Sequence, residues 1–383
     1  MTRHSDTARD LTLVDHRVTL RGPADLADAL PYLLGYHPDD SVVLIGLHGA
    51  RGRLGGRIRT GIPEDPGSWT EAAEQLASCL VEGSRARGGK PDAAVLYLCQ
   101  EPRDGGSARA VMERLRPLAQ RLRTACGALD VPVFEALYLS RTHYWSYCCP
   151  DGACCSGEGG ELPRAGTSPM AAAAAYAGLR VQGSLGQLRR RFAPLGEPVA
   201  SRQARALDRT AARLVPRLLG SPAAGEAARD QTLDLAELLL GRLREEPPPE
   251  RPDEAAADAR DDALLTAEDA ARLVLGLQDR EARDRAAEWM EGGEAPVALR
   301  LWRALARRCV AAYREHAAAP LTLAGWVSWS SGDETGARVA LGLALEADPE
   351  YVFATLLHQA LNEGLDPEPL RRCMRQQRAA RTL

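Results

Sequence analysis

The segment from Tyr138 to Cys155, which reads YLSRTHYWSYCCPDGACC, holds the densest group of residues that could do chemistry. It includes the end of a predicted strand, and open α/β sheets bind ligands at the carboxyl ends of their strands. Cys149 and Cys154 have the C-x4-C spacing of a zinc half-site, with Cys155 beside them; a redox-sensitive pair and plain thiols remain open alternatives. The other candidates are one catalytic residue, His143, and four binding residues, Arg141, Tyr144, Trp145 and Tyr147.

A second group of candidates lies in the sequence GYHPDDS, between the end of a predicted helix and a buried strand. His37, Asp39 and Asp40 supply an imidazole and two carboxylates, which suit general acid–base catalysis or metal binding. The pattern favours a simpler interpretation, in which a glycine ends the helix and the two aspartates form a turn. Convergence of His37 and Asp39 with Glu101 and His143 around one pocket would support an enzyme. Dispersal of these side chains would support an interaction protein.

Trp326 and Trp329 are the remaining candidates for binding. Aromatic residues are only 5% of the chain, so clusters of them stand out. Trp and Tyr concentrate binding energy at protein interfaces, and we therefore predict partner contacts at these two rings and in the Tyr144–Tyr147 stretch. Because the two tryptophans lie three residues apart on one helix face, a core position is an equally good interpretation. Burial of all these rings would remove the prediction.

Several chemistries are excluded by what the sequence lacks. No G-x-G-x-x-G follows a strand, and G-x-S-x-G, H-E-x-x-H and S-x-x-K are absent. Lys90 is the only lysine, and it lies in a Gly-Gly-Lys-Pro turn that fits neither a Schiff-base site nor a phosphate-binding loop. These absences argue against the familiar nucleotide-binding, serine-hydrolase and metalloprotease classes.

Composition and charge argue against nucleic-acid and membrane partners. The 383 residues carry a formal net charge of −4, so no overall positive field supports nucleic-acid binding. No apolar stretch approaches the roughly 20 residues that a membrane span needs, and the N-terminus has no signal-peptide core. We therefore expect a cytoplasmic protein without a membrane partner, whose nine cysteines are not a structural disulfide set.

The elements that would position these candidates fall into two parts. Residues 11–147 are predicted as an α/β domain, because buried strands over 42–47, 94–99 and 133–139 are separated by helical segments. This alternation predicts right-handed crossovers and a largely parallel sheet. The half-exposed strand over 56–62 would form an edge hairpin with the first of the buried strands.

The rest of the chain is predicted to be helical. A Cys- and Gly-rich loop over 148–168 leads to a helical segment over 169–243. Residues 244–262 are acidic and rich in proline, which predicts a solvated linker. A helical, repeat-like domain follows over 263–383, with small residues spaced as in one tetratricopeptide-like helix pair that begins near residue 318.

Three segments, taken in order, resemble the actinobacterial domain-of-unknown-function family 4192. They are LRGPADLADALPYLLGYHPDDSVVLIGL, HYWSYCCPDGACC and WVSWSSGDETGARVALGLALEADPEY, and the resemblance covers about residues 18–366. It implies a cytoplasmic protein with an α/β N-terminal region and a helical C-terminal region. No activity is established for the family, so the resemblance assigns no catalytic residue.

Two functions follow from these observations. The first is a non-enzymatic regulatory or protein-interaction module, favoured by the missing catalytic signatures, the repeat-like helices and the clustered aromatic residues. The second is a metal-dependent hydrolase or nuclease that uses the Gly35–Asp40 segment and adjacent strand ends. The first requires a protein partner, and the second requires that the candidate acids and bases converge.

Overall fold

The computed structural model describes residues 12–13, 16–17, 20–103, 105–149, 158–164, 166–247 and 253–382. The chain divides into two compact units, Met1–Leu185 and Gly186–Leu383. The boundary falls inside the stretch 169–243 that the sequence predicts as one helical segment. Helix α4 (Pro169–Tyr176) therefore belongs with the N-terminal unit, where it packs beside α1 (Pro23–Leu34).

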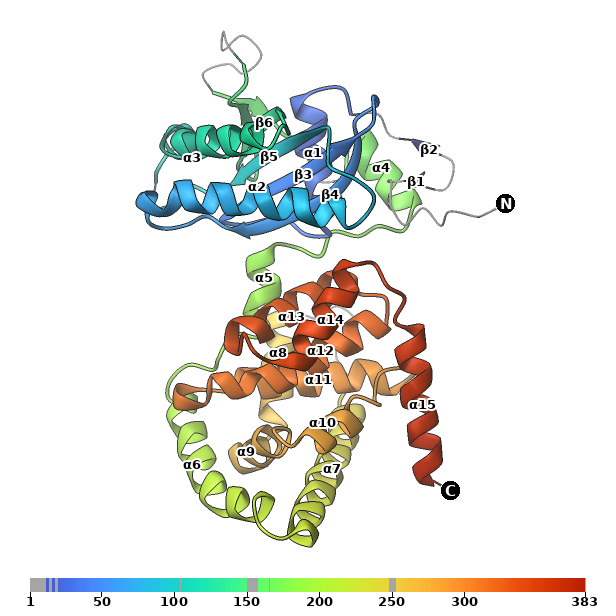
Figure 1. The fold of residues 1–383 in the computed structure, drawn as a ribbon. Coiled ribbons are helices and arrows are strands. Elements are labelled where there is room, and N and C mark those ends of the chain that lie inside the picture. Colours follow the sequence, from blue (N-terminus) through green and yellow to red (C-terminus); the bar gives the residue numbers. More distant parts are fainter. Residues whose placement is uncertain are drawn as a thin grey trace, which may run out of the picture. The chain divides into compact units, whose positions relative to one another are not determined.

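The N-terminal unit is built on a mixed six-stranded sheet with the order β4-β3-β5-β6-β7-β8 (Figure 1). Strand β3 runs antiparallel to both β4 and β5, and β5 pairs with β6 in parallel. The remaining pairs, β6–β7 and β7–β8, are antiparallel. The strands are β3 (Ser41–His48), β4 (Arg53–Gly61), β5 (Ala93–Cys99), β6 (Val133–Leu139), β7 (His143–Ser146) and β8 (Gly160–Glu161), with a separate pair β1 (Thr12–Leu13) and β2 (His16–Arg17).

The prediction of a largely parallel sheet is wrong, and the hairpin is the reason. Strand β4 runs antiparallel to β3. The helix that follows β4 leads the chain to β5, which therefore runs parallel to β4 and antiparallel to β3. Because β3 lies between β4 and β5, the crossover passes over it and leaves antiparallel neighbours on both sides of β3. The α/β class and the edge position of β4 agree with the sequence analysis.

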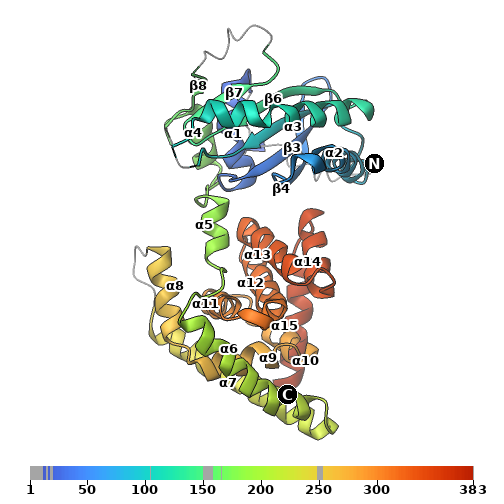
Figure 2. The same ribbon diagram turned by 90° about the vertical axis from the view of Figure 1, so that its left-hand side faces the viewer.

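Helices cover both faces of this sheet (Figure 2). On one face, α2 (Trp69–Arg85) and α3 (Ala108–Ala128) pack side by side against alternate residues of β3 and β5, including Leu44 and Leu96. On the other face lies α1, where Tyr97 Oη donates a hydrogen bond of 3.2 Å to the Leu26 carbonyl. A short 3-10 helix, Pro66–Ser68, precedes α2. The ends of β5 and β6 are thus held between two covered faces.

The C-terminal unit is helical throughout its described residues, and its most buried helix is α12. Every residue of α12 is buried, and α13 packs closely against it because position 325 is glycine. A Cβ atom there would lie 2.6 Å from Leu341 Cγ. The helices are α5 (Leu185–Arg190), α6 (Val199–Leu218), α7 (Pro222–Glu245), α8 (Glu254–Ala263), α9 (Ala267–Gly276), α10 (Arg280–Ala286), α11 (Glu294–Arg307), α12 (Ala318–Ser330), α13 (Glu334–Ala347), α14 (Val352–Asn362) and α15 (Glu368–Thr382), with 3-10 helices at Ala311–Tyr313 and Glu315–Ala317.

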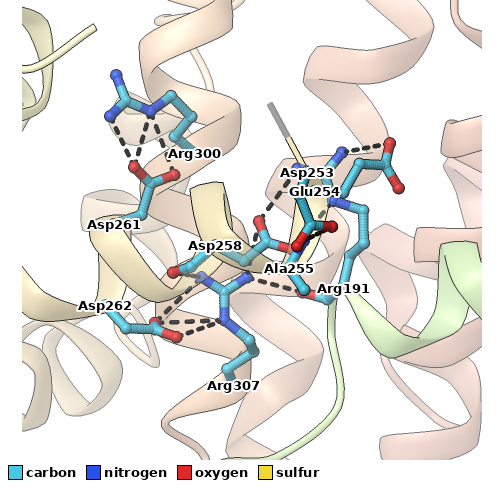
Figure 3. A network of polar contacts seen from close by, with 9 residues as sticks. All are labelled: Arg191, Asp253, Glu254, Ala255, Asp258, Asp261, Asp262, Arg300 and Arg307. Atoms are coloured by element: carbon cyan, nitrogen blue, oxygen red, sulfur yellow. Dashed lines mark hydrogen bonds and ion pairs between the residues drawn. The ribbon is translucent and has the colours of Figure 1, made fainter. Parts of the chain in front are cut away.

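The predicted solvated linker over 244–262 is wrong where the structure describes it. Helix α7 continues to Glu245, and α8 begins at Glu254 and packs on α11. Asp258, Asp261 and Asp262 share one face of α8 and meet arginines from other segments (Figure 3). Their carboxylates are paired inside the unit, so the acidic composition that suggests repulsion instead forms buried ion pairs.

Candidate functional site

The ends of β5 and β6 and the segment that enters β3 bring several predicted site residues together. The loop at 35–37 pairs with residues 182–185: His37 N donates to the Gly183 carbonyl (2.8 Å), and Leu185 N donates to the His37 carbonyl (2.9 Å). These two hydrogen bonds fix the backbone of His37, an exposed residue, just before the start of β3. The residues that follow, Asp39 and Asp40, then lead directly into β3.

Asp40 is tied to the end of β5 by an amide and an arginine. Gln100 Nε2 donates a hydrogen bond of 2.7 Å to Asp40 Oδ1, and Arg114 from α3 donates to Gln100 Oε1. Asp40 also has a left-handed backbone conformation, with φ of 41°, which aspartate tolerates better than most residues. The Asp40 carboxylate therefore holds the turn before β3, which agrees with the turn interpretation of the sequence.

Cys99 ends β5 with a buried thiol, and the charges of Asp39, Glu101 and Arg59 act on its pKa. Burial raises the pKa of this thiol, Asp39 and Glu101 raise it further, and Arg59 lowers it. Cys99 is therefore a neutral thiol at neutral pH and does not resemble an activated nucleophile. Arg59 is oriented by Ser41, since its Nε donates a hydrogen bond of 3.2 Å to Ser41 Oγ.

Arg141 is hydrogen-bonded to Glu101, and its charge acts on the pKa of His37. The Arg141 backbone N–H donates a hydrogen bond of 2.5 Å to Glu101 Oε1 at the turn between β6 and β7. Partial burial lowers the pKa of His37, Asp39 raises it, and the nearby Arg141 lowers it. The net shift is downward, so the imidazole is neutral at pH 7 and can accept a proton. The arrangement offers a neutral base, two carboxylates and two guanidinium groups within one sheet end.

His143 does not join this group. Its Nδ1 lies 2.8 Å from Thr142 Oγ1, and its ring lies 5.9 Å from that of Trp145. Within the part of the chain that the structure describes, no contact links the imidazole to His37, Asp39 or Glu101. The predicted convergence is thus incomplete. Asp39 and Arg141 act on the pKa of His37, and Glu101 accepts a hydrogen bond from the Arg141 backbone, but His143 packs on an aromatic ring.

The predicted aromatic contacts are wrong at four of five positions, because Trp145, Tyr147, Trp326 and Trp329 are buried. Tyr147 Oη donates to the Met112 carbonyl (2.9 Å), and Trp326 Nε1 donates to the Ala287 carbonyl (2.9 Å). These rings fill the cores of their own units. Tyr144 is half-buried and interacts within its unit.

The structure does not support zinc in the cysteine loop at Cys149, which is disulfide-bonded. A sulfur in a disulfide is not the thiolate that zinc requires. Cys154 and Cys155 lie outside the described residues. Over the described ranges, no group of three or more His, Cys, Asp or Glu side chains could hold a metal ion.

Two members of the sheet-end group carry no strong sequence signal. Arg59 shares a face of its strand with the exposed Arg57 and alternates with Ile58 and Thr60, which is typical of a solvated face. Arg114 lies on a helix whose pattern shows only which side is buried. Their roles depend on pairing between β3 and β4 and on the packing of α3 over β5, and neither can be located from residue spacing.

The fold and this site define a protein with an α/β unit that gathers ionisable groups at one sheet end, followed by a helical unit. The chain belongs to the family described as Domain of unknown function (DUF4192), whose model matches residues 23–368. No curated protein and no solved structure matches the chain. Among the described residues, no helix is both long and apolar enough to cross a membrane.

Proposed function

We propose that the protein is a non-enzymatic, cytoplasmic regulatory module whose helical unit binds a protein partner through α14. The observation that carries this proposal is an exposed aliphatic face. Val352 and Leu356 lie one turn apart on α14 and are 69% and 59% exposed, and Leu365 just beyond the helix is 54% exposed. A helix that leaves large aliphatic side chains in solvent is typical of an interaction surface.

The position of α14 indicates the kind of partner. Helices α12, α13 and α14 pack in succession, with α12 and α13 as the tetratricopeptide-like pair that we propose from the sequence. Ala354 and Leu357 cover the inner side of α14, so a further helix would pack on Val352 and Leu356. Exposed Glu350, Glu363 and Asp366 flank this face, which adds negative charge around it. We therefore propose an amphipathic helix with an apolar stripe and basic edges.

Replacing both Val352 and Leu356 with glutamine should weaken partner binding without unfolding the protein. Both side chains are exposed, so the free energy of unfolding should change by less than about 1 kcal/mol. Proteins captured from the native host by the wild-type chain are identified by mass spectrometry, and each is then purified and titrated against both forms. A specific partner should bind the double variant at least about tenfold more weakly.

The control is Leu238→Gln, because Leu238 is also exposed, at 53%, but lies on α7. This variant should bind the partner as the wild type does. Equal binding by the α14 variant would reject α14 as the docking face. Binding that does not weaken with salt would reject the basic edges proposed for the partner. Concentration-dependent dimerisation lost in the α14 variant would identify a second copy of the chain as the occupant and overturn the basic-helix proposal.

A second candidate function is hydrolysis at the sheet end. It is favoured by the charged groups that act on one another there: Asp39 and Arg141 on His37, and Asp39, Glu101 and Arg59 on Cys99. A neutral imidazole beside two carboxylates suits general acid–base catalysis, and two guanidinium groups suit an anionic substrate such as a phosphate ester. This candidate differs from a metal-dependent hydrolase, because the described side chains offer no three-ligand group.

If the sheet end is hydrolytic, activity should fall as the pH drops. Protonation of His37 removes the base, and because its pKa is lowered, the midpoint should lie below pH 6.5. His37→Gln and Glu101→Gln should each reduce kcat about 100-fold or more on bis-p-nitrophenyl phosphate. His358→Gln is the control, since burial also lowers the pKa of that histidine but it lies on α14. No turnover with or without added Mg²⁺ or Zn²⁺ would reject this candidate.

A further inference from the structure

The helical unit contains a cavity of about 330 Å³ between α6, α7 and α9, separate from both proposed sites. Figure 1 shows α9 between the other two helices. The side chains that matter at its wall are polar or charged: Thr210, Arg213, Arg217, Gln231, Glu268 and Arg272. Its volume is at the lower end of the range for small-molecule sites, about 300–1,000 Å³.

The cavity has more positive than negative charge. Arg213 NH1 lies 3.6 Å from Glu268 Oε1, and both side chains are largely exposed, so this ion pair is weak. Arg217 NH2 donates a hydrogen bond of 3.1 Å to Gln231 Oε1, a neutral partner. The Arg272 guanidinium has no hydrogen bond or ion pair within the described part of the chain. Three guanidinium groups therefore face one carboxylate, which Arg209 also approaches at 3.6 Å.

Thr210 gives a second and independent indication of a ligand. Its side chain is 4% exposed, and its Oγ1 is buried without a hydrogen-bond partner among the described residues. Buried polar groups in proteins nearly always have a partner. Thr232, across the cavity, shows the contrast, since its Oγ1 donates a hydrogen bond of 2.8 Å to the Ala228 carbonyl. The Thr210 hydroxyl is thus a donor or acceptor without a partner at the wall of a basic cavity.

We propose that this cavity binds the phosphate group of a small molecule. Guanidinium groups match phosphate oxygens with paired hydrogen bonds, and a phosphate offers more acceptor oxygens and more charge than a carboxylate. Three arginines and the Thr210 hydroxyl can satisfy that number of acceptors together. The volume fits a monophosphate and not a dinucleotide. This effector site goes beyond the interaction function of α14 and does not depend on it.

Isothermal titration calorimetry of the full chain at low ionic strength tests the proposal with inorganic phosphate, AMP and adenosine. Phosphate and AMP should bind with saturation, and adenosine should not. Tighter binding of AMP would identify a phosphate ester as the ligand, and tighter binding of phosphate would identify the free anion. The double variant Arg217→Gln/Arg272→Gln should weaken binding at least about tenfold. Two controls should bind phosphate as the wild type does. One is Arg205→Gln, which lies on α6 like Arg217 but outside the cavity, and the other is Val352→Gln/Leu356→Gln on α14.

Thr210→Val separates a ligand role from a structural one. Valine keeps the shape of threonine but removes the hydroxyl, so the melting temperature of the free protein should stay constant or rise. Binding of phosphate should weaken about threefold or more. A fall in melting temperature would show that the hydroxyl already has a structural partner. That result would overturn the proposal, as would no binding of phosphate and AMP, equal binding of adenosine, or binding unchanged in the arginine variant.

Discussion

Arg307→Ala is expected to destabilise the helical unit by about 3–5 kcal/mol, the cost of breaking a buried ion pair by removing one partner. Arg307 is buried, and its Nε donates a hydrogen bond of 2.9 Å to Asp262 Oδ2. Its NH1 donates to the Arg191 carbonyl (2.8 Å), and its NH2 donates to the Asp258 carbonyl (3.1 Å) (Figure 3). The alanine variant leaves a partly buried carboxylate and two backbone carbonyls without their donor.

The loss of folding free energy in the Arg307→Ala variant should depend on pH. Burial raises the pKa of Asp262 although Arg307 lowers it, so removal of the guanidinium should raise this pKa further. A group with a raised pKa in the folded state favours folding when it is protonated. The deficit of the alanine variant should therefore be largest near neutral pH and shrink as the pH falls through the pKa of Asp262.

Urea unfolding followed by circular dichroism measures this deficit, with Arg280→Ala as the matched control. Arg280 is 88% exposed in its side chain and lies 3.7 Å from Asp284, one helical turn away. An exposed pair of this kind contributes at most about 1 kcal/mol. Equal losses in the two variants would mean that the ion pairs of Arg307 do not anchor α8.

The same helix shows what sequence reasoning can and cannot supply. Acidic composition and proline predict solvent exposure, but the spacing of Asp258, Asp261 and Asp262 also places three carboxylates on one helical face. What the spacing cannot show is that Arg191 and Arg307, far apart along the chain, lie opposite them. Ion-pair partners that come from distant segments depend on tertiary packing, and local composition carries no record of it.

The sheet presents a similar division. The strands over 42–47, 94–99 and 133–139 follow from their apolar runs, and the structure places β3, β5 and β6 there. The directions of the strands do not follow from these runs. Strand β4 forms a hairpin with β3 before helix α2 begins, and as a result β5 runs antiparallel to β3. The partial convergence at the sheet end has the same origin. The His37 loop is held by hydrogen bonds to residues 183–185, and the charge of Arg141 acts on the His37 imidazole; no sequence motif predicts either interaction.

Trp326→Ala is expected to cost about 3–5 kcal/mol of folding free energy, which is typical of removing a large aromatic side chain from a core. Trp326 is 0% exposed, its ring lies 5.9 Å from that of Trp329, and its indole N–H satisfies the Ala287 carbonyl. Alanine would leave a cavity in a helix whose residues are all buried, and the cost of a core cavity adds to the lost burial of the ring. Calorimetric unfolding measures the loss, and Leu356→Gln on the exposed face of α14 is the control.

The outcome separates the two roles that an isolated pair of tryptophans can have. A core residue lowers the melting temperature of the free chain whether or not a partner is present. A contact residue leaves that temperature unchanged and weakens only the complex. Trp326→Phe, which keeps most of the ring but loses the indole donor, should fall between the wild type and alanine in stability. If Trp326→Ala melts like the wild type while partner binding is lost, the assignment of this ring to the core is wrong.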